Sequence, residues 1–171
     1  RSLAGLQPHS GEVAINGRPA DLGLVFQNAD LQLFSGTVRE EILYRVRNPD
    51  EAQLGWLLAS LGLTGAAATP PLLLSEGEKK RVALATVLMR QPRDGVLLDE
   101  PSLGQDAVHK AMLLRLCRAL ATAGQLVLMS THDLSLAAGA DRLLVLGTEG
   151  IVADGPPAAL LRAPEVWQRV G

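Results

Sequence analysis

The stretch Gly95–Pro101 reads GVLLDEP, an unbroken apolar run that ends in two carboxylates and a proline. A run of this length between a glycine and a proline predicts a buried strand over 95–99. Downstream the pattern alternates, and we expect a helix over 107–123, a strand over 125–130, a helix over 134–140 and a strand over 142–146. Apolar strands separated by helices of this length predict an α/β fold with a mostly parallel sheet covered on both faces.

The sequence before residue 92 predicts two short strands followed by a helical region. Residues 12–16 alternate polar and apolar and end in a turn signal, and residues 22–26 form a second apolar run. Thr37 and Asp50 stand where they would cap helices over 38–46 and up to residue 61. Two prolines then interrupt the pattern, and Ser75 begins a helix that Pro92 stops.

The composition limits the kind of protein this is. The chain has 171 residues, of which 47% are hydrophobic, so it can bury a core and most simply forms one domain. A formal net charge of −2 gives no general attraction to nucleic acid or anionic lipid. The single cysteine, Cys117, excludes an internal disulfide and lies among leucines, which favours a packing residue in a reducing compartment. No apolar run approaches the roughly 20 residues that span a bilayer.

Asp99 and Glu100 are the first candidates for chemistry. Because they follow an apolar strand, both carboxylates are expected at the carboxyl edge of the sheet, where ligands bind in such folds. An Asp there can hold Mg²⁺ through water, and a neighbouring Glu can polarise a water that attacks a phosphate. The alternative is an acidic pair that merely ends a strand before Pro101.

Several further polar residues have both a structural and a functional interpretation. Ser75 and Glu78 have the spacing of a capping box, which starts a helix and which is compatible with a second role. Asp106 is suited to cap the helix at 107, and Gln27 ends a strand. His132 follows the strand at 125–130, and a lone histidine in such a place is more often structural than catalytic.

Five stretches taken in order resemble the ATPase subunit of ATP-binding cassette (ABC) transporters. They are VFQ at 25–27, LSEGEKKR at 74–81, VLLDEP at 96–101, SLGQD at 102–106 and STHD at 130–133. Within that family, VFQN with QLF at 32–34, and LGQD at 103–106, are similar to the ATPases of energy-coupling-factor importers, which take up vitamins or cobalt and nickel ions.

The resemblance implies a P-loop NTPase (RecA-like) core with a helical sub-domain. The chain would form one such ATPase domain over 1–171. Residues 1–27 would supply strands of the nucleotide-binding core, residues 28–91 the helical sub-domain with the signature motif, and residues 92–171 the C-terminal part of the core.

The resemblance also implies ATP and Mg²⁺ as cofactors and gives each candidate a role. Glu100 and His132 would be catalytic, the first polarising the attacking water and the second contacting the γ-phosphate. Gln27 and Asp99 would serve the metal. The residues implied to act on nucleotide across a dimer interface are Ser75, Gly77, Glu78 and Asp106.

This chain departs from the family pattern in the signature motif, whose commonest form is Leu-Ser-Gly-Gly-Gln. Glu76 and Glu78 replace the first glycine and the glutamine. Glu76 adds a carboxylate near the place where a phosphate is expected to bind, which would weaken that half of the site unless the nearby residues Lys79, Lys80 and Arg81 offset it.

The partners implied by the resemblance are a second ABC ATPase subunit, identical or different, and a transmembrane transporter component. Residues 31–37 are expected to contact the membrane component. The protein would then lie on the cytoplasmic face of the cell membrane as a peripheral subunit, with no nucleic-acid partner.

The sequence contains no Gly-x-x-x-x-Gly-Lys-Ser/Thr run, the loop whose amides and lysine hold the β- and γ-phosphates. In the family this loop would precede Arg1, so we expect an N-terminally truncated chain that does not bind ATP well by itself. ATP hydrolysis coupled to import is therefore expected of the complete protein. The alternative is a non-catalytic module that completes a partner's ATP site.

Overall fold

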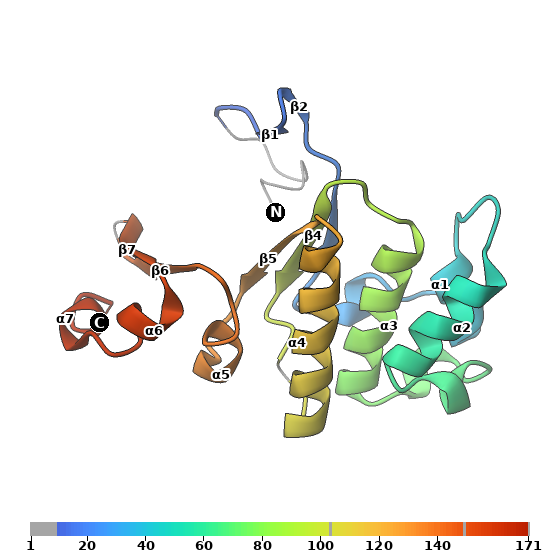
Figure 1. Cartoon of the computed structure of the whole chain (residues 1–171). Helices are drawn as coiled ribbons and strands as arrows, with labels where there is room; N and C mark the ends of the chain where they lie inside the picture. The colour runs from blue at the N-terminus through green and yellow to red at the C-terminus, as the bar shows by residue number, and fades with distance from the viewer. Residues whose placement is uncertain (1–9, 103, 149, 171) are drawn as a thin grey trace. The chain divides into compact units, whose positions relative to one another are not determined.

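The computed structural model describes residues 10–102, 104–148 and 150–170. The chain divides into two compact units, residues 1–130 and residues 131–171 (Figure 1).

A three-stranded parallel sheet forms the centre of the first unit. Its strands are β3 (Leu22–Val25), β4 (Gly95–Asp99) and β5 (Leu126–Ser130), in that order. Along β4 the register pairs Leu98 with Val25 on one side and with Met129 on the other. The predicted α/β fold with parallel strands is confirmed, and the strand expected over 95–99 has these bounds. All three strands end at the same edge of the sheet.

A small antiparallel hairpin precedes the sheet and consists of β1 (Ala14–Ile15) and β2 (Arg18–Pro19). Asn16 and Gly17 form its turn with φ of 52° and 74°, values that asparagine and glycine tolerate best. The hairpin is tied to the sheet because Arg18 forms two hydrogen bonds of 2.7 Å with Asp94, just before β4.

The helices of the first unit begin at the capping residues that the sequence predicts. Thr37, Asp50, Ser75 and Asp106 accept hydrogen bonds from backbone amides at the starts of α1 (Val38–Leu43), α2 (Glu51–Ser60), α3 (Glu76–Met89) and α4 (Ala107–Thr122). Short 3₁₀ turns lie at Ala29–Leu31 (η2), Thr64–Ala66 (η3) and Pro71–Leu73 (η4). Helix α3 contacts β3, and α4 contacts β5.

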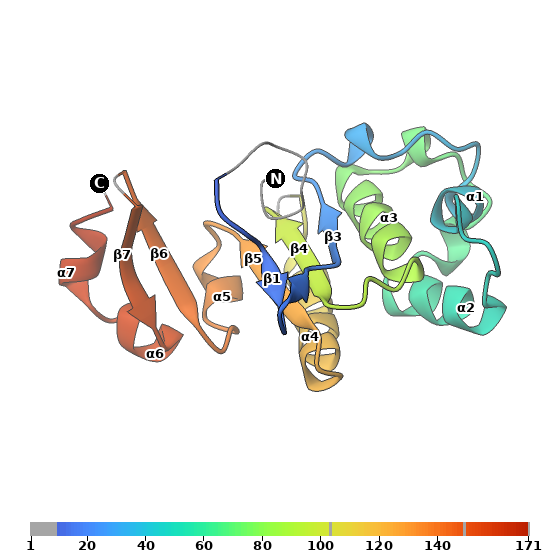
Figure 2. The ribbon, with the colours of Figure 1, turned by 90° about the horizontal axis from the view of Figure 1, so that it is seen from above.

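Helices α1 and α2 both contact α3 and form a helical group beside it, on the side of α3 away from β4 and β5 (Figure 1, Figure 2). The core of this group consists of aliphatic side chains that are at most 1% exposed, including Ile42, Leu54, Leu57 and Leu61. Helix α3 is buried over nearly its whole length and is therefore the element that joins the helical group to the sheet.

The apolar strands predict a sheet covered on both faces, and this prediction is wrong for β5. Exposed and half-buried positions alternate along this strand, and Leu126 and Leu128 are 46% and 37% exposed. The reason is that β5 is the last strand in the sheet order, and α4 packs against only one of its faces.

The second unit contains α5 (Leu134–Ala137), β6 (Leu143–Gly147), β7 (Gly150–Gly155), α6 (Pro157–Leu160) and α7 (Pro164–Trp167). We expected the strand near 142–146 to extend the parallel sheet, and this expectation is wrong, because β6 pairs antiparallel with β7. The connection between Gly147 and Gly150 is short enough for the two strands to fold back on each other. The helix expected over 134–140 is also shorter, ending at Ala137 ahead of Gly139.

No helix in the described parts of the chain is both long enough and apolar enough to cross a lipid bilayer.

Candidate functional site

Asp99 and Glu100 lie at the carboxyl edge of the sheet, where the sequence predicts them. Asp99 is the last residue of β4 and pairs with Ser130, the last residue of β5. The hydroxyl Oγ of Ser130 donates a hydrogen bond of 2.6 Å to Oδ1 of Asp99. The backbone N–H of Glu100 donates to the carbonyl oxygen of Ser130 at 3.0 Å. The neighbouring strand therefore positions the carboxylate of Asp99 and the backbone of Glu100.

The backbone turns sharply at Glu100, which has a φ of 47°. This left-handed conformation is uncommon for a residue other than glycine and is typical of positions that the surrounding structure constrains. One constraint comes from α3, because Nζ of Lys80 donates to the carbonyl oxygen of Glu100 at 2.9 Å. Burial lowers the pKa of Lys80, while the carboxylates of Glu76, Glu100 and Asp99 act in the opposite direction.

Gln27 leaves β3 at the same edge of the sheet, two residues after Val25, and its side chain is exposed. The chain just before it is fixed by Gln32, whose side chain accepts from the N–H of Phe26 at 3.0 Å and donates to the carbonyl of Leu24 at 3.2 Å. Gln27 and Asp99 thus follow neighbouring parallel strands at the same edge of the sheet, and Gln27 lies two residues beyond the strand that it was expected to end.

A complete capping box begins α3. Oγ of Ser75 donates to Oε2 of Glu78 at 2.6 Å, and the backbone N–H of Ser75 donates to the same oxygen at 2.9 Å. In return, the N–H of Glu78 donates to Oγ of Ser75 at 3.3 Å. The hydrogen bonds from Ser75 hold the pKa of Glu78 below its usual value. The structural interpretation of this pair is confirmed.

Gly77, in the first turn of α3, lies directly against the loop that follows β4. A Cβ atom at residue 77 would come within 2.7 Å of the carbonyl oxygen of Gly104, so only glycine fits without a shift of the backbone. The side chain of Gln105 donates to the carbonyl oxygen of Gly77 at 2.9 Å and accepts from Nη1 of Arg81 at 3.0 Å. The signature helix and this loop are therefore in direct contact within one chain.

Asp106 caps α4, as predicted. Its Oδ1 accepts from the backbone N–H of His109 at 2.8 Å and lies 2.8 Å from Nδ1 of the same histidine. These contacts lower the pKa of Asp106, the backbone hydrogen bond having the largest effect. The carboxylate is 65% exposed and therefore accessible to a partner.

His132 belongs to the second unit and lies between Ser130 and α5, with an exposed side chain. Its neighbour Asp133 caps α5 by accepting from the N–H of Ser135 at 2.9 Å. The catalytic role expected of His132 stays a prediction.

The donor atoms at the sheet edge suit Mg²⁺ bound together with a phosphate. Mg²⁺ prefers oxygen ligands and is usually held by one or two carboxylates, water and substrate phosphates. The hydroxyl of Ser130 fixes the carboxylate of Asp99 at this edge. Gln27, whose side chain carries an amide oxygen, follows the neighbouring strand β3 at the same edge. Among the described residues, no group of three or more His, Cys, Asp or Glu side chains could hold a metal alone. The metal would therefore depend on the nucleotide for further ligands.

The structure adds three residues that sequence reasoning did not select: Ser130, Lys80 and Gln105. Ser130 ends a strand next to Asp99, and strand register would have found it. Lys80 and Gln105 form contacts that no pattern along the chain reveals, because 20 and 28 residues separate them from the backbone oxygens they bind.

Comparison with known proteins gives consistent matches. The model of a family described as ABC transporter matches residues 1–103. The energy-coupling factor transporter ATP-binding protein EcfA of Methanothermobacter thermautotrophicus is 35% identical over 183 residues, covering 96% of this chain and 58% of the relative. The cobalt import ATP-binding protein CbiO of Rhodobacter capsulatus is 35% identical over 175 residues, covering 91% and 62%. The chain spans about three fifths of the length of these relatives.

Two solved structures share the fold. The cbiO1 protein of Clostridium perfringens, described as part of the ABC transporter complex cbiONQ, superposes with a TM-score of 0.77 and 26% identity, covering 98% of this chain and 74% of that one. A bacterial Atm1-family ABC exporter with ATP bound gives a TM-score of 0.74 and 28% identity over 87% of this chain and 28% of the exporter.

Proposed function

Because the chain belongs to the ABC transporter family of ATP-binding proteins, we propose that the complete protein hydrolyses ATP to drive import of a vitamin or of cobalt or nickel ions. The similarity to EcfA and to CbiO supports the energy-coupling-factor type of importer. The observation that carries the proposal is the acidic edge of the sheet, where Ser130 orients Asp99 and the strained turn at Glu100 follows directly.

In this proposal Asp99 and Gln27 hold Mg²⁺ on the nucleotide, and Glu100 polarises the water that attacks the γ-phosphate. His132 contacts the same phosphate. When bound, Mg²⁺ supplies the positive charge that offsets the charge developing on the transferred phosphoryl group. The family's Gly-x-x-x-x-Gly-Lys-Ser/Thr loop would hold the β- and γ-phosphates, and no such run occurs in the 171 residues.

A second ATPase subunit, identical or related, would complete each nucleotide site. Ser75 and Gly77 lie at the positive end of α3, a helix of 14 residues, and a helix N-terminus of this kind attracts phosphate. Together with Glu78 they would face the nucleotide on the opposite subunit, and the exposed carboxylate of Asp106 would cross the interface.

Residues 31–37 form the proposed contact with a transmembrane component, which would keep the protein at the cytoplasmic face of the membrane. Leu31 and Phe34 are 68% and 64% exposed, although both are large and apolar. Phe34 packs edge-to-face on Tyr44, with ring centroids 4.6 Å apart. The buried carboxylate of Glu41 accepts from the N–H groups of Phe34 and Ser35 at 2.7 and 2.6 Å. A rigid loop that presents apolar side chains is suited to bind another protein.

The experiment is ATP hydrolysis by the complete protein with its membrane partner, compared with the Glu100→Gln variant. A catalytic subunit loses at least about 100-fold in kcat in the variant, since a residue that activates the attacking water contributes this much. Equal and negligible rates in both proteins would reject the proposal. They would favour a non-catalytic module in which Ser75 and Gly77 serve a partner's site.

A further inference from the structure

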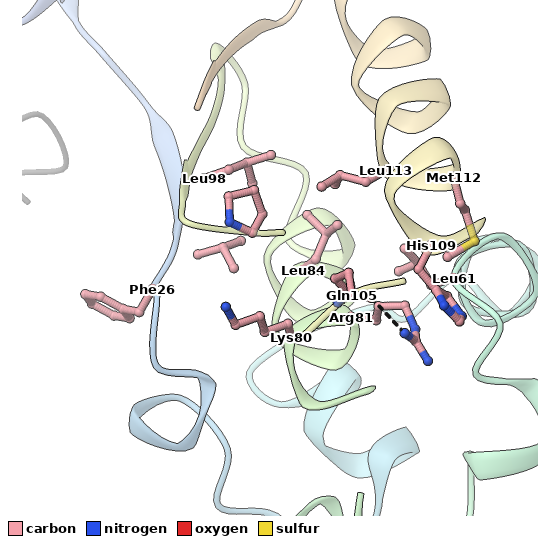
Figure 3. Close-up of a pocket in the computed structure, with 12 residues that line it drawn as sticks. Phe26, Leu61, Lys80, Arg81, Leu84, Leu98, Gln105, His109, Met112 and Leu113 are labelled. Carbon is pink, nitrogen blue, oxygen red and sulfur yellow. Dashed lines mark hydrogen bonds between the residues drawn. The ribbon is translucent and has the colours of Figure 1, made fainter. Parts of the chain in front are cut away.

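The loop that carries Glu100 and Asp106 is fastened to α3 by two side chains that have no role in the proposed chemistry. Lys80 donates to the carbonyl oxygen of Glu100 at 2.9 Å. Gln105 accepts from Arg81 at 3.0 Å and donates to the carbonyl oxygen of Gly77 at 2.9 Å. Figure 3 shows Arg81 and Gln105 joined in this way, with Lys80 extending from the same helix. Loop and helix are thus linked at both ends of the loop.

These links are partly buried, and the two cationic side chains that form them are buried. Lys80 is 4% exposed and Arg81 is 9% exposed, and both line a small pocket whose other walls include Leu84, Leu98 and Leu113 (Figure 3). A charged group in such surroundings is costly unless a hydrogen-bond partner compensates it. Burial lowers the pKa of both side chains. Their positions are therefore fixed by the few polar atoms they bind.

The partner of Lys80 is a backbone oxygen, so this contact sets the path of the main chain. Glu100 has a φ of 47°, a conformation that is unfavourable for a residue with a side chain. The hydrogen bond from Lys80 helps to hold the peptide in this orientation. Without it, the turn is free to relax, and the side chain of Glu100 would be displaced with it.

Gln105 fixes the other end of the same loop. Its carboxamide uses both its acceptor and its donor on α3, and the backbones of Gly77 and Gly104 approach too closely to admit a Cβ atom. Asp106 follows Gln105 directly, so its position also depends on this contact. The start of α3 is therefore fastened to Glu100 at one end of this loop and to Gln105 at the other.

We propose that Lys80 and Gln105 are positioning residues, which hold Glu100 and Asp106 at fixed positions relative to Ser75 and Gly77. The inference rests on the proposed function, in which Glu100 acts on the subunit's own nucleotide and Ser75 and Gly77 act on the partner's.

The test uses two variants of the complete protein, assayed with its membrane partner. Lys80→Met removes the donor to Glu100 and keeps the length of the side chain. Gln105→Glu keeps an acceptor for Arg81 and loses the N–H that binds the carbonyl of Gly77. Lys79→Met is the matched control, since it removes the same charge one residue away, where the lysine pairs with Asp30 at 2.8 Å. Lys80→Arg retains a charged donor and is the rescue variant.

We expect Lys80→Met and Gln105→Glu to lower kcat by about tenfold to 100-fold, because small displacements of catalytic groups have effects of this size. KM for ATP should change less than about threefold, since neither side chain binds nucleotide. Lys80→Arg should recover part of kcat, and Lys79→Met should resemble the wild type. In the same proteins, amide hydrogen exchange over residues 100–106 should accelerate in Lys80→Met and Gln105→Glu.

Wild-type kcat and wild-type exchange in both variants would overturn the inference, as would a loss in Lys79→Met equal to that in Lys80→Met. If the wild type itself hydrolyses no ATP, the proposed function fails, and hydrogen exchange alone decides whether the two side chains fix the loop. If Lys80→Met does not fold, Gln105→Glu decides, because Gln105 lies nearer the surface and its replacement has the same length.

Discussion

The hydroxyl of Ser75 donates a 2.6 Å hydrogen bond to the carboxylate of Glu78, three residues further along the same helix. The proposed function needs this hydroxyl for a phosphate. In this chain it already has an anionic acceptor, whose pKa is held below its usual value by that same contact. The charge of Glu78 therefore competes with the nucleotide in two ways, by occupying the hydroxyl and by repelling the phosphate.

Glu78→Gln should consequently tighten ATP binding by the assembled protein. The amide removes the negative charge and still offers an oxygen to the N–H of Ser75, so the capping box persists. We expect KM for ATP to fall about threefold to tenfold, as the loss of one nearby, solvent-screened like charge allows. The melting temperature should change little. Glu40→Gln, an exposed carboxylate on α1, is the control, and an unchanged or higher KM in Glu78→Gln would contradict the prediction.

Gly77→Ala tests the close approach of α3 to the loop after β4. A glycine inside a helix normally costs about 1 kcal/mol relative to alanine, so the substitution would ordinarily stabilise the protein. At residue 77 the new methyl would meet the carbonyl oxygen of Gly104 at 2.7 Å, and we expect a loss of about 1–3 kcal/mol instead. Urea unfolding measures the difference. Gly55→Ala in α2 is the matched control, because no atom lies within 4 Å of its added Cβ, and it should stabilise.

The sequence predicts local features well because they depend on near neighbours. Each expected capping residue of the first unit caps its helix, since a cap needs only an acceptor at the right place in the chain. The apolar run over 95–99 likewise predicts strand β4 with its observed bounds. The division of the chain at residues 27 and 91 stays a prediction.

Sequence reasoning failed where the outcome depends on distant parts of the chain. The apolar residues near 143–147 fit a parallel strand as well as the antiparallel hairpin that β6 forms with β7. The exposure of Leu126 depends on which elements lie over β5. The contacts of Lys80 with Glu100 and of Gln105 with Gly77 join segments 20 and 28 residues apart, and no periodicity in the sequence marks such pairs.

Acid should weaken the attachment of the β1–β2 hairpin. Asp94 accepts two hydrogen bonds from Arg18 and one of 2.8 Å from the N–H of Asp21, and these contacts place its pKa well below the usual range. Because the folded state lowers this pKa, the stabilisation is complete above the ordinary carboxyl pKa of about 4 and is lost as the pH falls towards the folded-state value.

Asp94→Asn should therefore lower the unfolding midpoint at pH 7, and the difference from wild type should shrink below about pH 4. The same substitution at the exposed Asp141 is the control, and a pH-independent difference at Asp94 would contradict this account.

The thiol of Cys117 should react slowly in the folded protein. Burial raises its pKa to about 11, so very little thiolate is present at neutral pH. We expect alkylation by iodoacetamide at pH 7.5 to be about 100-fold slower than in urea, where the pKa returns to about 8.5. Mass spectrometry of the labelled protein measures both rates. Similar rates in the two conditions would show that the thiol is exposed or activated.

We expect Glu41 to affect binding of the membrane component, because it holds the loop at residues 31–37 in place. The side chain is completely buried, and its Oε2 accepts from the N–H groups of Phe34 and Ser35. Glu41→Gln removes the charge that strengthens both hydrogen bonds. We expect the free energy of unfolding to fall by about 1–3 kcal/mol and hydrogen exchange over residues 31–37 to become faster.

Phe34→Ala instead keeps the loop and removes an exposed ring, so the free energy of unfolding should fall by about 1 kcal/mol or less. In pull-down with the membrane component both variants should bind less well, whereas hydrogen exchange over residues 31–37 should accelerate only in Glu41→Gln. Normal binding by Phe34→Ala would show that residues 31–37 do not form the contact with the membrane component.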